Sequence, residues 1–238
     1  MASAAFDLRA ASFQMPTTTS TPGMIYGVLL NDPATLAEMG EALNTAPYKA
    51  PPKAPVLYIK TSNTRAGDGA AVAVPAKPGT VCVGATLGLV IGRAARRVPP
   101  ARAMEHVRAY VIASDLFLPT DSVFRPAVRH RCRDGFCPMS EEFAVSLLPE
   151  PSQAQLTIHI DGAAVQRRTL SGLVRSAPQL LADVSDFMTL EAGDVLLLGA
   201  AHDAPRARAG QSVRIEVDGL GALRHHLVAE ADLAGLAR

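Results

Sequence analysis

Short apolar runs, separated by turns that contain glycine and proline, dominate the hydrophobic pattern along this chain. Most of them are rich in valine, isoleucine and leucine and are too short for core helices, so they predict β-strands. These runs lie at residues 24–30, 56–60, 81–92, 110–113, 192–200 and 211–230. Residues 156–168 add an apolar/polar alternation followed by Asp161-Gly162, a pair that favours a β-hairpin.

Helical spacing of apolar residues is confined to three segments. The first begins at Asp32, a candidate N-cap followed by Pro33, and the others span residues 99–110 and 177–190. The residues predicted to share the apolar side of the third segment are Leu180, Leu181, Val184 and Phe187. Strands with a few interspersed helices, and no regular strand–helix–strand alternation, favour an α+β or mixed β fold over a doubly wound sheet.

The N-terminal residues differ in character from the rest of the chain. Residues 1–23 contain a cluster of threonine, serine and proline, which predicts a flexible extension, and residues 24–238 are expected to form a single domain. The extension has no basic start followed by an apolar run, as a signal peptide would. No apolar run reaches the roughly 20 residues that cross a bilayer. We therefore expect a cytoplasmic protein without a membrane partner.

Composition narrows the possible partners. The formal net charge is +1 and charged residues make up 19%, so the chain lacks the basic excess that nucleic acid binding requires. Hydrophobic residues make up 48%, which is enough for a sizeable core. The three cysteines, Cys82, Cys132 and Cys137, are predicted to be free thiols because their spacing fits neither a disulfide framework nor a usual zinc site.

Two charged residues stand at the ends of predicted strands. Asp115 follows an apolar strand, where an acid can reach the mouth of a pocket; a turn-former or helix cap is the plainer reading. Lys60 ends the strand 56–60 and precedes a glycine-containing loop, where a lysine can anchor a carboxylate or an enolate oxygen. From spacing alone, a surface lysine is the more frequent case. His225 and His226 are expected at the surface.

Arginines alternate in the segment 129–133. If this segment is extended, Arg129, Arg131 and Arg133 lie on one face, where their guanidinium groups suit a substrate with several carboxylates. A solvated edge strand whose charges prevent aggregation is an equally good interpretation.

Several ordered stretches together resemble the fumarylacetoacetate hydrolase family. They span residues 46–53, 84–92, 110–119, 132–138 and 190–199, and the likeness covers roughly residues 24–230. The resemblance implies a mixed β-roll or sandwich fold. Within the family the chain is similar to the N-terminal half of enzymes that isomerise and decarboxylate ring-cleavage products of aromatic catabolism, here as a free-standing subunit.

The resemblance also implies a divalent cation, Mg²⁺ or Mn²⁺, held by a Glu-x-Glu pair and an aspartate. Asp115 matches the aspartate, but Gly84 and Thr86 stand where the two glutamates belong. A hard cation needs several anionic oxygens, so this site is incomplete in the chain alone.

By the same resemblance, Lys60 and Arg131 are the candidate catalytic residues, and Arg131 replaces a lysine of the family. Arg125, Arg133 and Asp134 are the candidate substrate-binding residues. The loop Gly199-Ala200-Ala201 lacks the threonine with which the family contacts substrate.

The expected substrate is an oxo-acid with two or three carboxylates. The expected assembly is a homodimer, or a hetero-oligomer with a homologous metal-bearing subunit. The alternative is a catalytically silent scaffold that completes the dimer of such a homologue.

Overall fold

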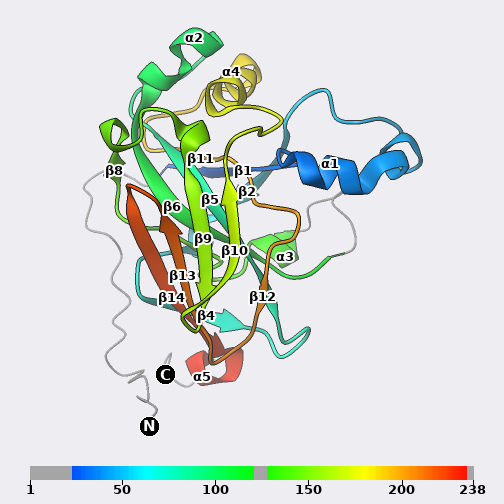
Figure 1. Ribbon diagram of the computed structural model, residues 1–238, viewed down its shortest axis with the longest axis vertical. Helices are drawn as coiled ribbons and strands as arrows, with labels where there is room; N and C mark the ends of the chain where they lie inside the picture. The colour runs from blue at the N-terminus through cyan, green and yellow to red at the C-terminus, as the bar shows by residue number, and fades with distance from the viewer. Residues whose placement is uncertain (1–22, 121–127, 235–238) are drawn as a thin grey trace.

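The computed structural model describes residues 23–120 and 128–234, and it confirms the predicted mixed β fold with few short helices (Figure 1). A seven-stranded sheet, the first sheet, has the order β2-β1-β11-β5-β6-β8, with β12 paired to β5. Its strands are β1 (Ile25–Leu29), β2 (Val56–Lys60), β5 (Val81–Ile91), β6 (Val107–Phe117), β8 (Phe143–Ala144), β11 (Val195–Leu197) and β12 (Arg206–Ala207).

The second sheet has five strands in the order β10-β9-β13-β14-β4. They are β4 (Ala70–Val74), β9 (Gln155–Ile160), β10 (Ala163–Thr169), β13 (Ser212–Val217) and β14 (Gly221–Ala229). The hairpin predicted at Asp161-Gly162 is present, because β9 and β10 are antiparallel neighbours on either side of it. Two short strands, β3 (Arg65–Ala66) and β7 (Cys137–Pro138), form a separate parallel pair.

The main core lies between the inner faces of the two sheets. Leu87 and Ile112 of the first sheet belong to one buried cluster with Ile158 and Ile215 of the second. A hydrogen bond also crosses this core, because His225 Nε2 lies 3.0 Å from Ser114 Oγ. The expectation that His225 is a surface residue is therefore wrong: it faces inward on β14 and is fully buried.

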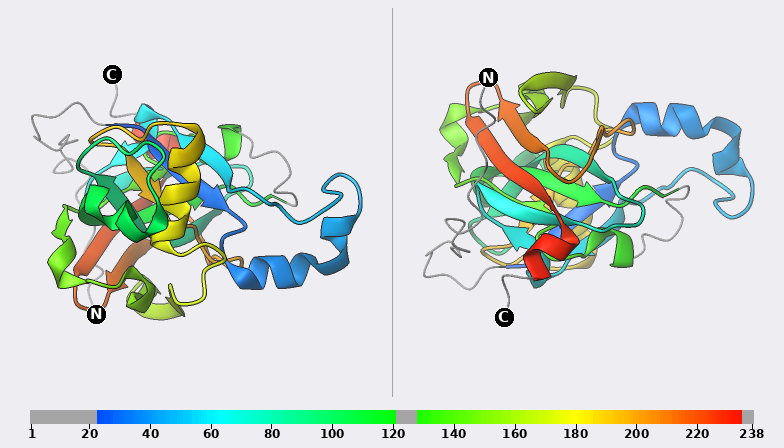
Figure 2. Two further views of the ribbon diagram at one scale, coloured as in Figure 1. Left: turned by 90° about the horizontal axis from the view of Figure 1, so that it is seen from above. Right: turned by 90° about the horizontal axis from the view of Figure 1, so that it is seen from below.

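The helices are short: α1 (Pro33–Met39), α2 (Pro100–Ala103), α3 (Val128–Arg131), α4 (Ala177–Phe187) and α5 (Glu230–Ala234). Asp32 caps α1 as predicted, accepting a hydrogen bond from the backbone N–H of Thr35. On α4, Leu180, Leu181 and Val184 are buried, but Phe187 is exposed at the last turn. Figure 2 shows α1 projecting from the body of the molecule, and α2 and α4 side by side at one end.

Two predictions about local structure are wrong. The helix expected over residues 99–110 is shorter: α2 ends at Ala103, a 3-10 helix follows over Met104–His106, and from Val107 the chain pairs with β5 as β6. The segment 129–133 is not extended, because residues 128–131 form α3. Consequently Arg129, Arg131 and Arg133 do not share a face: Arg131 is buried while Arg129 is exposed.

Among the residues that the structure describes, no helix is long and apolar enough to cross a membrane. All three cysteines are free thiols, as predicted.

Candidate active site

The structure brings Lys60 and Asp115 together, although they come from distant parts of the first sheet. Lys60 ends β2 and Asp115 lies near the end of β6, with β1, β11 and β5 between these strands. Their contact, 2.7 Å between Nζ and Oδ1, therefore requires the sheet to curl. Lys60 is 0% exposed and Asp115 is 1% exposed, so this is a buried ion pair.

The Lys60 ammonium is completely surrounded by oxygen atoms. It donates hydrogen bonds to the backbone carbonyls of Leu116 at 2.7 Å, Arg131 at 2.9 Å and Phe136 at 2.9 Å. An ammonium has three N–H donors, so these carbonyls use all of them. Asp115 Oδ1 is left with no hydrogen-bond donor and is held by the charge of Lys60. Lys60 thus holds three backbone segments beside Asp115 and also neutralises the Asp115 carboxylate.

The second oxygen of Asp115 is also occupied. Tyr58 Oη donates a hydrogen bond to Oδ2, and Arg131 Nη1 lies 3.3 Å from the same oxygen. The Arg131 guanidinium stacks on two rings, 4.4 Å from the centroid of Tyr58 and 4.5 Å from that of Phe117. Such cation–π contacts hold a desolvated guanidinium in place. We call Tyr58, Lys60, Asp115 and Arg131 the ion cluster.

The ion cluster controls the protonation of its own members. Burial alone would raise the pKa of Asp115, but the charges of Lys60 and Arg131 outweigh it and hold that pKa below its usual value. Burial, together with the charge of Asp115, raises the pKa of Tyr58 well above its usual value. Burial also raises the pKa of the neighbouring Cys137 to about 12. At neutral pH the Asp115 carboxylate is therefore ionised, whereas the Tyr58 phenol and the neighbouring Cys137 thiol are neutral.

These residues do not fit a magnesium or manganese site. Gly84 and Thr86 lie on the same face as Asp115, but neither supplies an anionic oxygen. A Cβ atom at Gly84 would stand 2.7 Å from Ala200 Cβ and 2.8 Å from the Asp115 carbonyl, so a glutamate there needs the backbone to move. Among the described residues, no group of three histidine, cysteine, aspartate or glutamate side chains converges on one point.

Tyr58 is the member of the ion cluster that sequence reasoning missed. It lies two residues before Lys60 on β2, so both side chains point to the same face of the sheet. Its ring lies directly over Gly27 of β1, where a Cβ atom would be 2.1 Å from the ring. A glycine opposite an aromatic residue on a neighbouring strand is a signal that could have found this contact.

The predicted substrate-binding residues lie outside the ion cluster. Arg133 is half-buried and forms an ion pair with Glu230 of α5. Asp134 is exposed and accepts a hydrogen bond from Asn63 Nδ2 at 2.7 Å. Arg125 lies outside the described residues. Lys60, Arg131 and Asp115 are thus brought together, whereas Arg133 and Asp134 have other partners.

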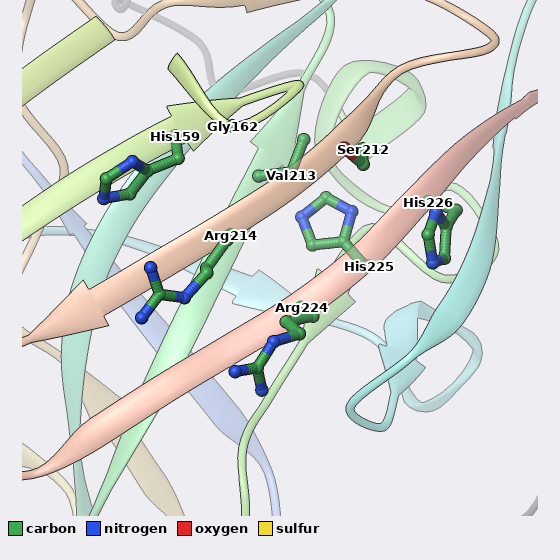
Figure 3. Close-up of a pocket in the computed structure, with 8 residues that line it drawn as sticks. All are labelled: His159, Gly162, Ser212, Val213, Arg214, Arg224, His225 and His226. Carbon is green, nitrogen blue, oxygen red and sulfur yellow. The ribbon is translucent and has the colours of Figure 1, made fainter. Parts of the chain in front are cut away.

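Two pockets lie away from the ion cluster. One, of about 510 Å³, lies between the segment around Lys53 and helix α4. The other, of about 250 Å³, opens on the second sheet between β9, β13 and β14 (Figure 3). We call it the arginine pocket; its lining residues are His159, Gly162, Ser212, Val213, Arg214, Arg224, His225 and His226. No member of the ion cluster lines either pocket.

Mixed sheets with a few short helices place the chain in the class of proteins with the fumarylacetoacetate hydrolase fold. Residues 24–228 match the family model described as "Fumarylacetoacetate (FAA) hydrolase C-terminal". The chain belongs to the fumarylacetoacetate hydrolase family.

Relatives within the family are known enzymes. The chain is 37% identical to the 4-hydroxyphenylacetate degradation bifunctional isomerase/decarboxylase of Salmonella dublin, over 89% of this chain and 48% of that protein. It therefore spans about half the length of that relative. Over 88% of the chain it is similar to the 5-carboxymethyl-2-hydroxymuconate delta-isomerase of Mycobacterium smegmatis, covering 80% of that chain with 28% identity and a TM-score of 0.74.

A third comparison supports the fold alone. Fumarylpyruvate hydrolase from Pseudomonas aeruginosa, solved in complex with Mn²⁺ and pyruvate, has a TM-score of 0.76 and 22% identity. The match covers 91% of this chain and 94% of that one. Members of this fold therefore include proteins solved with manganese bound.

Proposed function

We propose that this chain is one subunit of an isomerase/decarboxylase of 4-hydroxyphenylacetate catabolism and works beside a homologous subunit that carries the metal. The substrates are the ring-cleavage products 5-carboxymethyl-2-hydroxymuconate and 5-oxopent-3-ene-1,2,5-tricarboxylate. The observation that carries the proposal is the coverage: 37% identity extends over 89% of this chain but only 48% of the bifunctional relative. We take the remaining half of that enzyme as the pattern for the companion subunit.

The ion cluster supports a division of labour between the two subunits. Both oxygens of Asp115 already have cationic or hydrogen-bonding neighbours from the same chain. The companion subunit therefore supplies the divalent cation, Mg²⁺ or Mn²⁺, which as a Lewis acid stabilises an enolate. This chain contributes cationic side chains that attract and orient the substrate carboxylates.

Arg133 is the residue of this chain best placed for such a contact. Its side chain is 33% exposed, whereas that of Arg131 is 8% exposed and already pairs with Asp115. Its ion pair with Glu230, half exposed to water, is weak enough for a substrate carboxylate to compete. In this proposal Lys60 has a positioning role, because it holds the Arg131 carbonyl two residues before Arg133.

The test is a mixing experiment. The purified chain, a Glu-x-Glu-containing homologue and Mg²⁺ are combined, and the loss of absorbance of the conjugated substrate is followed. We expect a rate well above that of the homologue alone. A rate equal to that of the homologue, at any ratio of the two chains, contradicts the proposal.

A scaffold without catalytic contribution is the second candidate function, because the predicted site is filled by its own side chains. Arg133→Ala distinguishes the two. A substrate-binding role predicts a higher KM in the mixed enzyme, whereas a scaffold predicts unchanged KM and kcat. Arg129→Ala is the matched control, since Arg129 is exposed on the neighbouring helix α3 and loses the same charge.

A further inference from the structure

The buried carboxylate of Asp115 needs positive charge, and the chain supplies two units of it. An unpaired carboxylate is strongly disfavoured inside a protein. Lys60 provides one charge at 2.7 Å from Oδ1, and Arg131 provides the other at 3.3 Å from Oδ2. These two cations more than neutralise the single carboxylate, so Asp115 needs no metal for charge balance.

The shape of the site agrees with its charge. The Tyr58 hydroxyl and the Arg131 guanidinium both reach Oδ2, and the rings of Tyr58 and Phe117 enclose the guanidinium. At Gly84, where the resemblance places a metal ligand, Ala200 and the Asp115 backbone leave no room for a side chain. Side chains therefore enclose the Asp115 carboxylate, and the neighbouring Gly84 position has no space for a metal ligand.

We infer that Asp115 binds no metal, because the Arg131 guanidinium and the Lys60 ammonium already neutralise it and occupy both of its oxygens. This inference rests on the proposed division of labour and explains how the metal-free subunit keeps its fold. Arg131 is a positioning residue: it neutralises Asp115 and does not touch the reacting atoms.

The first experiment uses the isolated chain and Mn²⁺ alone. Electron paramagnetic resonance measures free Mn²⁺ in the presence of the wild-type chain and of Asp115→Asn. We expect the two titrations to coincide over the micromolar to millimolar range. Binding by the wild type that Asp115→Asn removes would overturn the inference.

The second experiment separates the charge of Arg131 from its packing. Thermal unfolding is compared for Arg131→Lys, which keeps the charge, and Arg131→Met, which keeps much of the volume without it. We expect Arg131→Met to melt lower than Arg131→Lys by about 6 °C or more, since it leaves a buried carboxylate with one cation fewer. Equal melting temperatures would overturn the inference. Both experiments omit the companion subunit and substrate, so their outcome is independent of the mixing assay.

A separate observation concerns the outer face of the second sheet. His159, Arg214 and Arg224 are direct neighbours across β9, β13 and β14, and Ser212 and His226 form the next row (Figure 3). Two arginines directly opposite each other on paired strands repel. Glu216 offsets Arg214 at 2.9 Å, but Arg224 has no carboxylate within ion-pair distance among the described residues.

We propose that the arginine pocket binds a small oxyanion between Arg214 and Arg224. Guanidinium groups recognise carboxylate and phosphate through paired N–H donors, so either can supply the ligand. The pocket volume of about 250 Å³ admits a phosphate or a small dicarboxylate. Asp161, which precedes the lining residue Gly162, already accepts hydrogen bonds from Ser212 and Gln211.

The test compares melting temperatures in sodium phosphate, sodium malonate and sodium chloride at equal ionic strength. A ligand of the folded state stabilises it, so phosphate or malonate should raise the melting temperature of the wild type above its value in chloride. Arg224→Gln should abolish that rise, and Arg96→Gln, which removes an exposed arginine elsewhere, should keep it. A rise in one salt alone identifies the ligand as phosphate or carboxylate. No rise in either salt, or an equal rise in Arg224→Gln, would overturn the proposal.

Discussion

The ion cluster and the arginine pocket are both rich in cationic side chains, but they differ in burial and in how fully these charges are paired. In the ion cluster, Lys60 and Arg131 are buried and enclose one carboxylate. In the arginine pocket, Arg214 and Arg224 stand on an open sheet face, and Glu216 offsets only the first of them among the described residues. Burial requires that charges be paired within the chain, whereas exposure to water leaves them available for a ligand.

The largest loss of stability is expected when Lys60 of the ion cluster is replaced. Lys60→Met leaves the Asp115 carboxylate and three carbonyls without their ammonium, and we expect a loss of about 3–5 kcal/mol in the free energy of unfolding. Urea denaturation measures this loss. Lys77→Met, at an exposed lysine, should change it by less than about 0.5 kcal/mol. A similar small change for Lys60→Met would mean that the ion cluster does not stabilise the fold.

Asp115→Asn should have an effect that depends on pH. The pKa of Asp115 is lowered in the folded state, so its ionisation stabilises the fold above the unfolded value of about 3.9, and this stabilisation is lost as the pH falls towards the folded pKa. We expect Asp115→Asn to be less stable than the wild type by about 3 kcal/mol at pH 7. The gap should narrow below about pH 4. A gap that stays constant down to pH 3 in urea denaturation would contradict the assignment of the charge to Asp115.

The buried His225 should make stability fall in mildly acidic solution. Burial lowers its pKa from 6.5 to about 3 in the folded state, so the unfolded chain binds a proton first as the pH drops. Stability should therefore be complete above about pH 6.5 and decrease by up to about 1.4 kcal/mol per pH unit below it. Urea denaturation of His225→Gln between pH 7 and pH 4.5 should lack most of this slope. His130→Gln, at a histidine outside the core, should retain it.

The smallest effect is expected in the arginine pocket. Arg224→Gln removes a charge that lies opposite Arg214, so it should leave stability unchanged or raise it by about 0.2–1 kcal/mol at low salt. Added sodium chloride should shrink any gain, because salt screens exposed charges. A loss of more than about 1 kcal/mol would show that Arg224 has a structural partner and would weaken the comparison between the two regions.

Much of the fold could be predicted because its signals are local. The cap at Asp32, the turn at Asp161-Gly162 and the apolar strand 81–92 all depend on residues adjacent in the chain. Where a local signal competed with a distant partner, the prediction failed. Val107 and Tyr110 fit helical spacing, but pairing with β5 draws them into β6.

Three of the four members of the ion cluster could be predicted from the sequence, but Tyr58 and the burial of Arg131 could not. Lys60, Asp115 and Arg131 were identified by the family resemblance, and they are in contact. The part played by Tyr58 depends on Gly27 of a neighbouring strand, and the burial of Arg131 depends on α3 being helical rather than extended. Both depend on contacts between segments that are distant in the chain, and residue spacing carries no information about such contacts.

The three carbonyls around Lys60 have a consequence for how this protein can vary. They belong to Leu116 near the end of β6, to Arg131 at the end of α3 and to Phe136, so three separate points of the chain meet at one nitrogen atom. A single side chain thus joins the end of β6 to α3 and to Phe136. Substitutions on the exposed side of α3, such as at Arg129, should therefore leave the Asp115 carboxylate in place.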